Sequence, residues 1–155
     1  MAPDVTLEYP YVYHCAVLPE WVDYNGHMSE AYYVLAFGFA TDQAMDGLGM
    51  DEQYRERTGS SLYTVEAHIR YLAEARQGEA LTITTSIAGT AAKKLHLLHE
   101  MHSGGTLIAT EELLALHTAS GRAAPFPDRI AGIIETRLGS GDGEPPVWVG
   151  RSVTL

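Results

Sequence analysis

The sequence predicts an α+β fold in which an antiparallel β-sheet wraps around one long, buried central α-helix. The first observation is a run of eleven residues without a charged side chain, residues 31–41, inside a segment that favours a helix. A helix that is apolar on every side belongs inside a core. The second observation is a series of four strand-like segments after residue 60. Because one sheet cannot cover such a helix on all sides, we expect self-association into a homodimer or tetramer.

The N-terminal part of the chain predicts a strand followed by two helices. Residues 9–18 are aromatic and β-branched, which suits a strand, and Pro19 ends it. A long helix is expected over residues 28–46, and the glycine-rich residues 47–49 stop it. A short polar helix follows at residues 51–57. The large apolar side chains of the long helix recur at helical spacing: Met28, Tyr32, Leu35 and Phe39.

The second half of the chain changes to a period of two. Residues 62–72 alternate apolar and polar side chains, which is typical of a half-buried strand. Ser103-Gly104-Gly105 predicts a hairpin turn between the last two strands. The final strand contains good helix formers, but its hairpin partner requires it to be extended. The expected strands are residues 62–72, 79–90, 93–103 and 106–120, and a helix is expected at residues 128–137.

Composition limits the class of protein. We assign residues 1–138 to a single domain and residues 139–155 to a linker-like tail, whose end docks as an edge strand or stays mobile. The net charge of −10 argues against a nucleic-acid partner. Cys15 is the single cysteine, so no internal disulfide forms and a reducing cytoplasm is expected. No apolar run approaches the roughly 20 residues that span a bilayer, and no signal peptide is visible, so we expect no membrane association.

A polar knot, residues 23–27 with the sequence Asp-Tyr-Asn-Gly-His, precedes the apolar helix. From the residues alone, Asp23 is either a capping residue or a catalytic carboxylate, and Gly26 is a turn glycine. His27 is either structural or part of a site. Several histidines invite a metal hypothesis, but their spacing is not a zinc signature, so we expect no metal. Those histidines are His96, His99, His102 and His117.

The order of the elements and the polar knot before a buried helix resemble the hotdog-fold acyl-CoA thioesterases, in their 4-hydroxybenzoyl-CoA thioesterase branch. Four segments are similar to the betainyl-CoA thioesterases of carnitine breakdown: "WVDYNGHMSEAYYVLAFGFATD", "EAHIRYL", "KKLHLLHE" and "LLALHTASGRAAPFP". In some organisms that thioesterase is fused to carnitine dehydrogenase. This chain has no glycine-rich dinucleotide-binding segment, so we expect the free-standing form. It departs from the pattern where "TAAKKLHL" and "LALHTASG" lack an Asp expected near each.

The resemblance implies a hotdog fold and the hydrolysis of a small acyl-CoA, with betainyl-CoA giving glycine betaine and CoA as the leading reaction. A different short-chain or aromatic acyl group, or a non-catalytic acyl-CoA-binding module, remains open. Coenzyme A enters as part of the substrate and leaves as product, and no other cofactor is implied.

The resemblance also implies roles for the polar knot. Asp23 corresponds to the family's aspartate and acts as general base or as nucleophile. Gly26 and His27 are expected where the helix begins, because unpaired N–H groups there polarise a carbonyl. Asn25 holds the loop or contacts the substrate.

Two further groups of side chains complete the predicted site. Aromatic rings near the polar knot bind a quaternary ammonium by cation–π attraction, although core packing explains any one of them equally well. Basic side chains meet the phosphates of CoA, although solvated surface charge is the alternative for each lysine. The rings are Trp21, Tyr24, Tyr32 and Tyr33, and the basic residues are Lys93, Lys94 and Arg122.

Overall fold

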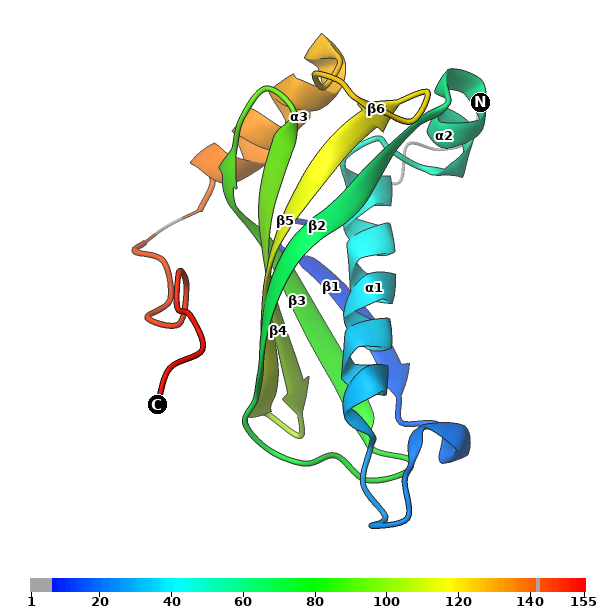
Figure 1. Ribbon diagram of the computed structural model, residues 1–155, viewed down its shortest axis with the longest axis vertical. Helices are drawn as coiled ribbons and strands as arrows, with labels where there is room; N and C mark the ends of the chain where they lie inside the picture. Colours follow the sequence, from blue (N-terminus) through cyan, green and yellow to red (C-terminus); the bar gives the residue numbers. More distant parts are fainter. Residues whose placement is uncertain (1–6, 142) are drawn as a thin grey trace.

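The structure is a computed structural model that describes residues 7–141 and 143–155. Its sheet has the strand order β1-β3-β4-β5-β2, every named pair is antiparallel, and β6 pairs with β5. The sheet curls, and α1 runs along it (Figure 1). This is the predicted α+β architecture. In order the elements are β1 Tyr11–Ala16, the 3₁₀ turn Pro19–Trp21, α1 Glu30–Gly47, α2 Glu52–Thr58, β2 Ser60–Tyr71, β3 Ala80–Thr90, β4 Lys94–Ser103, β5 Thr106–Ala119, β6 Arg122–Ala123 and α3 Asp128–Gly139.

The long helix exists as predicted, but one chain covers only part of it. The buried side of α1 packs over β1 and β3, and small residues such as Ala36 and Ala40 allow the close approach. On its other side Val34, Leu35 and Phe39 are exposed. An apolar helix face left in water is unfavourable. The expected second subunit therefore stays a prediction, with this face as its reason.

The hairpin between β4 and β5 explains why a helix-forming segment is a strand. Gly104 and Gly105 have φ of +56° and +81°, the left-handed conformations that a tight hairpin turn needs. β5 pairs with β4 on one side and β2 on the other. Two hydrogen-bonded neighbours outweigh the intrinsic preference of "ATEELLAL" for a helix.

The regular half-burial predicted for residues 62–72 is wrong for much of β2. Leu62 is buried, but Tyr63 and Val65 are 57% and 54% exposed. The pairing with β5 shifts register between Thr64 and Glu66, and such a bulge puts the alternation out of step. β2 also lies at the edge of the sheet opposite β1, whereas α1 packs on β1 and β3. The exposed side chains follow from both facts.

The C-terminal tail docks through turns and not as an edge strand. After α3 the described residues form no helix or strand, only turns, a bend and irregular backbone. Trp148 is nonetheless buried, and the N–H of Gly150 donates to Oε2 of Glu112 at 2.7 Å. Among the helices of residues 7–141 and 143–155, none is both long and apolar enough to cross a membrane.

Candidate active site

The polar knot is a closed turn. Val22 and Met28 form an antiparallel bridge across its base. Inside it the N–H of Asp23 donates to the carbonyl of His27 at 3.0 Å, and the N–H of Gly26 donates to the carbonyl of Asp23 at 3.0 Å. Gly26 has φ of +80°, which a residue with a side chain adopts only at a cost in strain. The glycine is therefore required by the turn itself.

The carboxylate of Asp23 is held but remains accessible. Its Oδ1 accepts the N–H of Asn25 at 2.8 Å, which fixes the side chain against its own turn. Asp23 is half-buried. The N-cap of α1 is Ser29, so Asp23 does not cap that helix. Asp23 therefore caps its own turn and not α1. This role uses only Oδ1, so the carboxylate can still take part in chemistry.

The helix begins later than predicted. α1 starts at Glu30, and Gly26 and His27 lie before it in the turn. The N–H of Gly26 is already bonded within the turn, so it is not available to an oxyanion. The N–H groups without an intrahelical partner belong to the first turn of α1, from Glu30 onward. The N–H groups expected to face the oxyanion are therefore those from Glu30 onward, four residues after Gly26.

His27 faces the loop after β2. Its Nε2 lies 3.1 Å from Oε2 of Glu74, and its backbone forms a bridge with Arg76. The N–H of Met28 donates to the carbonyl of Ala75 at 2.8 Å. These contacts join the polar knot to the segment that leads from β2 into β3. The backbone bonds anchor the knot, and the contact between His27 and Glu74 adds a partly exposed side-chain pair.

The predicted aromatic group divides into three. Trp21 is buried and stacks on Tyr32, with ring centroids 5.7 Å apart and 13° between the planes. Tyr33 instead donates its hydroxyl to the carbonyl of Ala73 at 3.2 Å and meets Tyr71 edge-on at 5.3 Å. Tyr24 is 97% exposed in the knot. Tyr33 and Tyr71 line a hollow of about 310 Å³ at the start of α1, shared with Met28, Glu30, Leu72, Ala73 and Glu74.

The predicted CoA-binding cations lie far from the polar knot of the same chain. Val17, two residues before the 3₁₀ turn, bonds to Glu79 at the start of β3, whereas Lys93 follows the end of that strand. Eleven strand residues span about 33 Å. Figure 1 shows the knot at the lower end and the β3–β4 and β5–β6 turns at the upper end. Lys93, Lys94 and Arg122 are exposed there.

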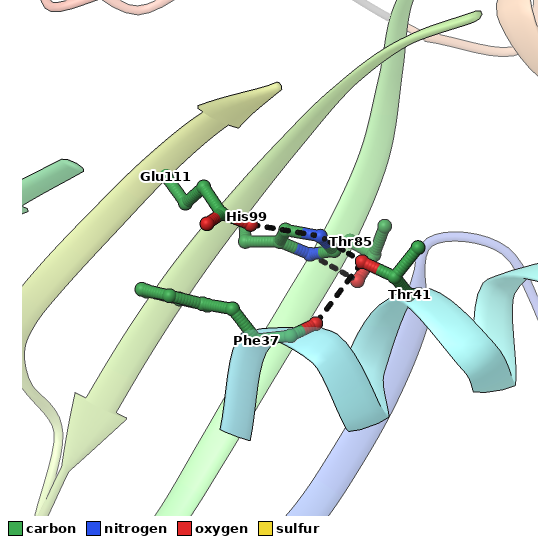
Figure 2. A network of polar contacts seen from close by, with 5 residues as sticks. All are labelled: Phe37, Thr41, Thr85, His99 and Glu111. Carbon is green, nitrogen blue, oxygen red and sulfur yellow. Dashed lines mark hydrogen bonds and ion pairs between the residues drawn. The ribbon is translucent and has the colours of Figure 1, made fainter. Parts of the chain in front are cut away.

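A buried polar network beneath α1 escaped the sequence prediction (Figure 2). His99 of β4 and Glu111 of β5 are cross-strand neighbours on adjacent strands, and both are buried. The side chains of Thr41 and Thr85 form hydrogen bonds with the imidazole of His99. Burial lowers the pKa of His99 to about 3 and raises the pKa of Glu111 to about 7. The alternation along residues 95–99 does place His99 on the same face as Leu95 and Leu97, which is the one local signal for its burial. Counting register from the Gly104-Gly105 turn would have placed Thr110 opposite His99, because the irregularity between Met101 and His102 that brings Glu111 there has no signal in the sequence.

The other histidines do not assemble a metal centre in the described residues. His96 lies on the opposite face of β4 from His99 and pairs with Glu112, Nε2 to Oε1 2.8 Å. Within residues 7–141 and 143–155, no three His, Cys, Asp or Glu side chains are grouped to hold a metal ion. His117 bonds instead to the hydroxyl of Tyr54 at 3.0 Å.

Comparison with known proteins is consistent across sequence and structure. The model of the thioesterase-like superfamily matches residues 17–134. The chain is 37% identical to a betainyl-CoA thioesterase of Pseudomonas aeruginosa over 92% of this chain and 93% of that protein. It is 37% identical to an L-carnitine dehydrogenase/betainyl-CoA thioesterase of Agrobacterium fabrum, but spans only 31% of that longer protein.

Two solved structures share the fold over nearly the whole chain. A putative thioesterase of Pseudomonas putida superposes with a TM-score of 0.82 at 35% identity, covering 92% of this chain and 94% of that one. A Staphylococcus aureus protein solved in complex with CoA superposes with a TM-score of 0.88 at 26% identity, covering 93% and 94%. These likenesses confirm the predicted hotdog-type thioesterase fold.

Proposed function

The chain belongs to the thioesterase-like superfamily, and we propose that it hydrolyses betainyl-CoA to glycine betaine and coenzyme A. The observation that carries this proposal is the 37% identity to a betainyl-CoA thioesterase over 93% of that protein's length. Coenzyme A is part of the substrate and of the products, and the reaction needs no other cofactor. We place the enzyme in the cytoplasm, in keeping with its single cysteine.

We assign the attack on the thioester to Asp23. Its carboxylate either takes a proton from a water that attacks the carbonyl carbon, or attacks that carbon itself. In the second route the C–S bond breaks, CoA leaves as its thiolate, and water hydrolyses the resulting anhydride. The hydrogen bond from Asn25 to Oδ1 and the half-exposed position of the side chain support either route.

The first turn of α1 is the proposed oxyanion site. The N–H groups of Glu30 and Ala31 lie at the positive end of the helix dipole. They are placed beside the polar knot because Ser29 donates its N–H to the carbonyl of Trp21 at 2.9 Å. Donors fixed in this way stabilise the charge that develops on the thioester oxygen in the transition state.

We propose that the working enzyme is a dimer that pairs through the β2 edge. The exposed residues of β2, Tyr63 and Val65, and the exposed face of α1 support this. In a two-fold antiparallel arrangement the upper end of one chain approaches the polar knot of its partner. That arrangement is how Lys94 and Arg122 would reach a CoA whose thioester lies at the partner's knot, because within one chain the separation is about 33 Å.

The test is the rate of thiol release from a panel of acyl-CoAs. The panel contains betainyl-CoA, acetyl-CoA, a medium-chain acyl-CoA and 4-hydroxybenzoyl-CoA. The expected result is fastest release from betainyl-CoA. In Asp23→Asn the rate should fall by at least about a hundredfold, because a carboxylate that activates or attacks contributes that much. Asp42→Asn, an exposed aspartate on α1, is the matched control and should be unchanged.

Two results would overturn the proposal. Faster release from a neutral acyl-CoA would remove betainyl-CoA as the substrate. Equal rates in wild type and Asp23→Asn would remove Asp23 from the chemistry. Because Asn also has a side-chain oxygen to accept the N–H of Asn25, the turn should persist, which circular dichroism and the unfolding midpoint would verify.

A further inference from the structure

The side chain of Glu111 is almost fully buried, and no donor among the described residues forms a hydrogen bond with its carboxyl group. It lies on the inner face of β5, between Ile69 of β2 and His99 of β4, and only 5% of the residue is exposed. Oε1 of Glu111 lies 3.7 Å from Nε2 of His99. That distance is beyond a hydrogen bond. The carboxyl oxygens are not fully enclosed, so a small polar or charged partner from outside the fold can reach them.

The hydrogen bonds around His99 show that the imidazole does not serve Glu111. The hydroxyl of Thr41 donates to the carbonyl of Phe37 at 3.0 Å, so its oxygen is free to accept from Nε2 of His99 at 2.9 Å. Nε2 therefore carries the proton, and Nδ1 accepts from the hydroxyl of Thr85 at 2.8 Å (Figure 2). The single N–H of a neutral imidazole is thus used on Thr41.

His99 also brings no positive charge to the carboxylate. Its burial beneath Phe37, with ring centroids 5.6 Å apart, holds the pKa of His99 at about 3. A buried carboxylate with neither a donor nor a cation is unfavourable, and burial raises the pKa of Glu111 to about 7. An apolar residue would stabilise the fold better at this position. The structure therefore points to a partner for Glu111 that is not part of the fold.

The surroundings of Glu111 lead to the predicted active site. Tyr71 lies two residues beyond Ile69 on β2, and its pKa is raised by burial and then by the charges of Glu30 and Glu111. Tyr71 also lines the 310 Å³ hollow at the start of α1. Along the helix, Phe37 lies seven residues after Glu30, or about 10 Å. Because His99 stacks on Phe37 and bonds to Thr41, the carboxylate lies beneath the middle of α1, and Tyr71 connects its surroundings to the hollow at the helix start.

We propose that Glu111 is the specificity residue that recognises the cationic acyl group of the substrate. A quaternary ammonium has no N–H to donate, so it is bound by negative charge and by aromatic faces. Glu111 supplies the charge, and Tyr33 and Tyr71 line the approach. In betainyl-CoA the cation is two bonds from the thioester carbonyl, so with the thioester at the start of α1 the acyl group would extend through the hollow toward Glu111. The inference rests on the proposed function and names the residue that selects its substrate.

The test compares two substrates of the same shape. Betainyl-CoA and 3,3-dimethylbutanoyl-CoA differ only in a quaternary nitrogen replaced by carbon. In Glu111→Gln, kcat/KM for betainyl-CoA should fall by at least about tenfold, since a desolvated cation contact is worth that factor or more. The value for the neutral isostere should stay the same or rise. Glu100→Gln, one residue from His99 on the other face of β4, removes the same charge and should alter neither.

Each outcome decides between the two proposals. If Glu111→Gln keeps the preference for betainyl-CoA, or slows both substrates equally, the inference fails while the proposed function stands. If wild type hydrolyses neither substrate, the proposed function fails. Calorimetric titration with glycine betaine then decides the inference: binding that Glu111→Gln abolishes and Glu100→Gln retains supports it, and absence of binding to wild type overturns it. The Gln side chain has nearly the volume of Glu, so a folded variant is expected.

Discussion

Replacing Glu111 with Gln is expected to stabilise the protein, and mainly above pH 5. In the folded chain the pKa of Glu111 is about 7, against an ordinary value of 4.5. A group whose folded pKa is raised favours folding most below its unfolded pKa. That contribution is lost as the pH rises from 4.5 through 7.

The size of this stability change follows from the rise in the pKa of Glu111 on folding. Each pKa unit corresponds to about 1.4 kcal/mol, so the free energy of unfolding should fall by about 3 kcal/mol across this range, most of it between pH 5 and pH 8. Gln cannot ionise, so Glu111→Gln should not show this loss. In a domain of this size the difference amounts to roughly 10 °C in Tm at pH 8.

Urea unfolding at pH 5 and pH 8 measures the effect, with wild type, Glu111→Gln and Glu100→Gln in parallel. The stability gain of Glu111→Gln over wild type should be larger at pH 8 by about 2–3 kcal/mol. Ionisation of His99 is common to all three proteins and cancels in the difference. A gain of equal size at both pH values, or a loss at pH 8, would refute the reasoning that Glu111 is buried without a partner.

Three further predictions concern the same network and the sheet edge. Because the pKa of His99 falls from 6.5 to about 3 on folding, stability in the Glu111→Gln background should decline as pH drops from 6.5 to 4, by about 3 kcal/mol in urea titrations, and a flat profile would contradict it. Thr41→Val removes the acceptor for the His99 N–H and should destabilise by about 1–3 kcal/mol in the same titrations, whereas no change would show that the bond is dispensable. Val65→Lys should shift the protein toward monomer in sedimentation velocity, while Val147→Lys in the exposed tail should not; an unchanged dimer would exclude the β2 edge as the interface.

The fold was largely predictable because its signals are local. The uncharged run of residues 31–41 and the Gly104-Gly105 turn act over a few residues, and each fixes an element regardless of the rest. The path of β2 was not predictable in the same way. Nothing in residues 64–66 marks the extra residue that shifts its register with β5, and burial there depends on where α1 packs.

The candidate site was predictable only where a motif carried it. Asp23 and Gly26 belong to a contiguous turn, so their neighbourhood follows from the sequence, although the helix start does not. Glu111 lies in a segment of helix formers and becomes notable only when it pairs with His99, twelve residues away. That pairing depends on the β4–β5 register, which itself shifts between Met101 and His102. Long-range register is the information that composition and period lack.

The pH dependence of catalysis gives an independent view of Glu111. A bound cation stabilises the carboxylate, so betainyl-CoA should bind with release of a proton below pH 7 and without it above. The titratable side chains facing Glu111 are His99 from β4 and Tyr71 from β2, while α1 contributes Phe37. The pKa of His99 is about 3 and that of Tyr71 is raised above 10, so neither titrates near neutrality.

The ratio of kcat/KM for betainyl-CoA to that for 3,3-dimethylbutanoyl-CoA isolates this titration. Ionisation of Asp23, or of any other group that acts on the thioester, changes kcat/KM for both substrates by the same factor. That factor cancels in the ratio. The ratio should rise with pH, level off above about pH 7, and become independent of pH in Glu111→Gln. A ratio that is already flat in wild type would mean that the carboxylate does not meet the cation, whatever its role in stability.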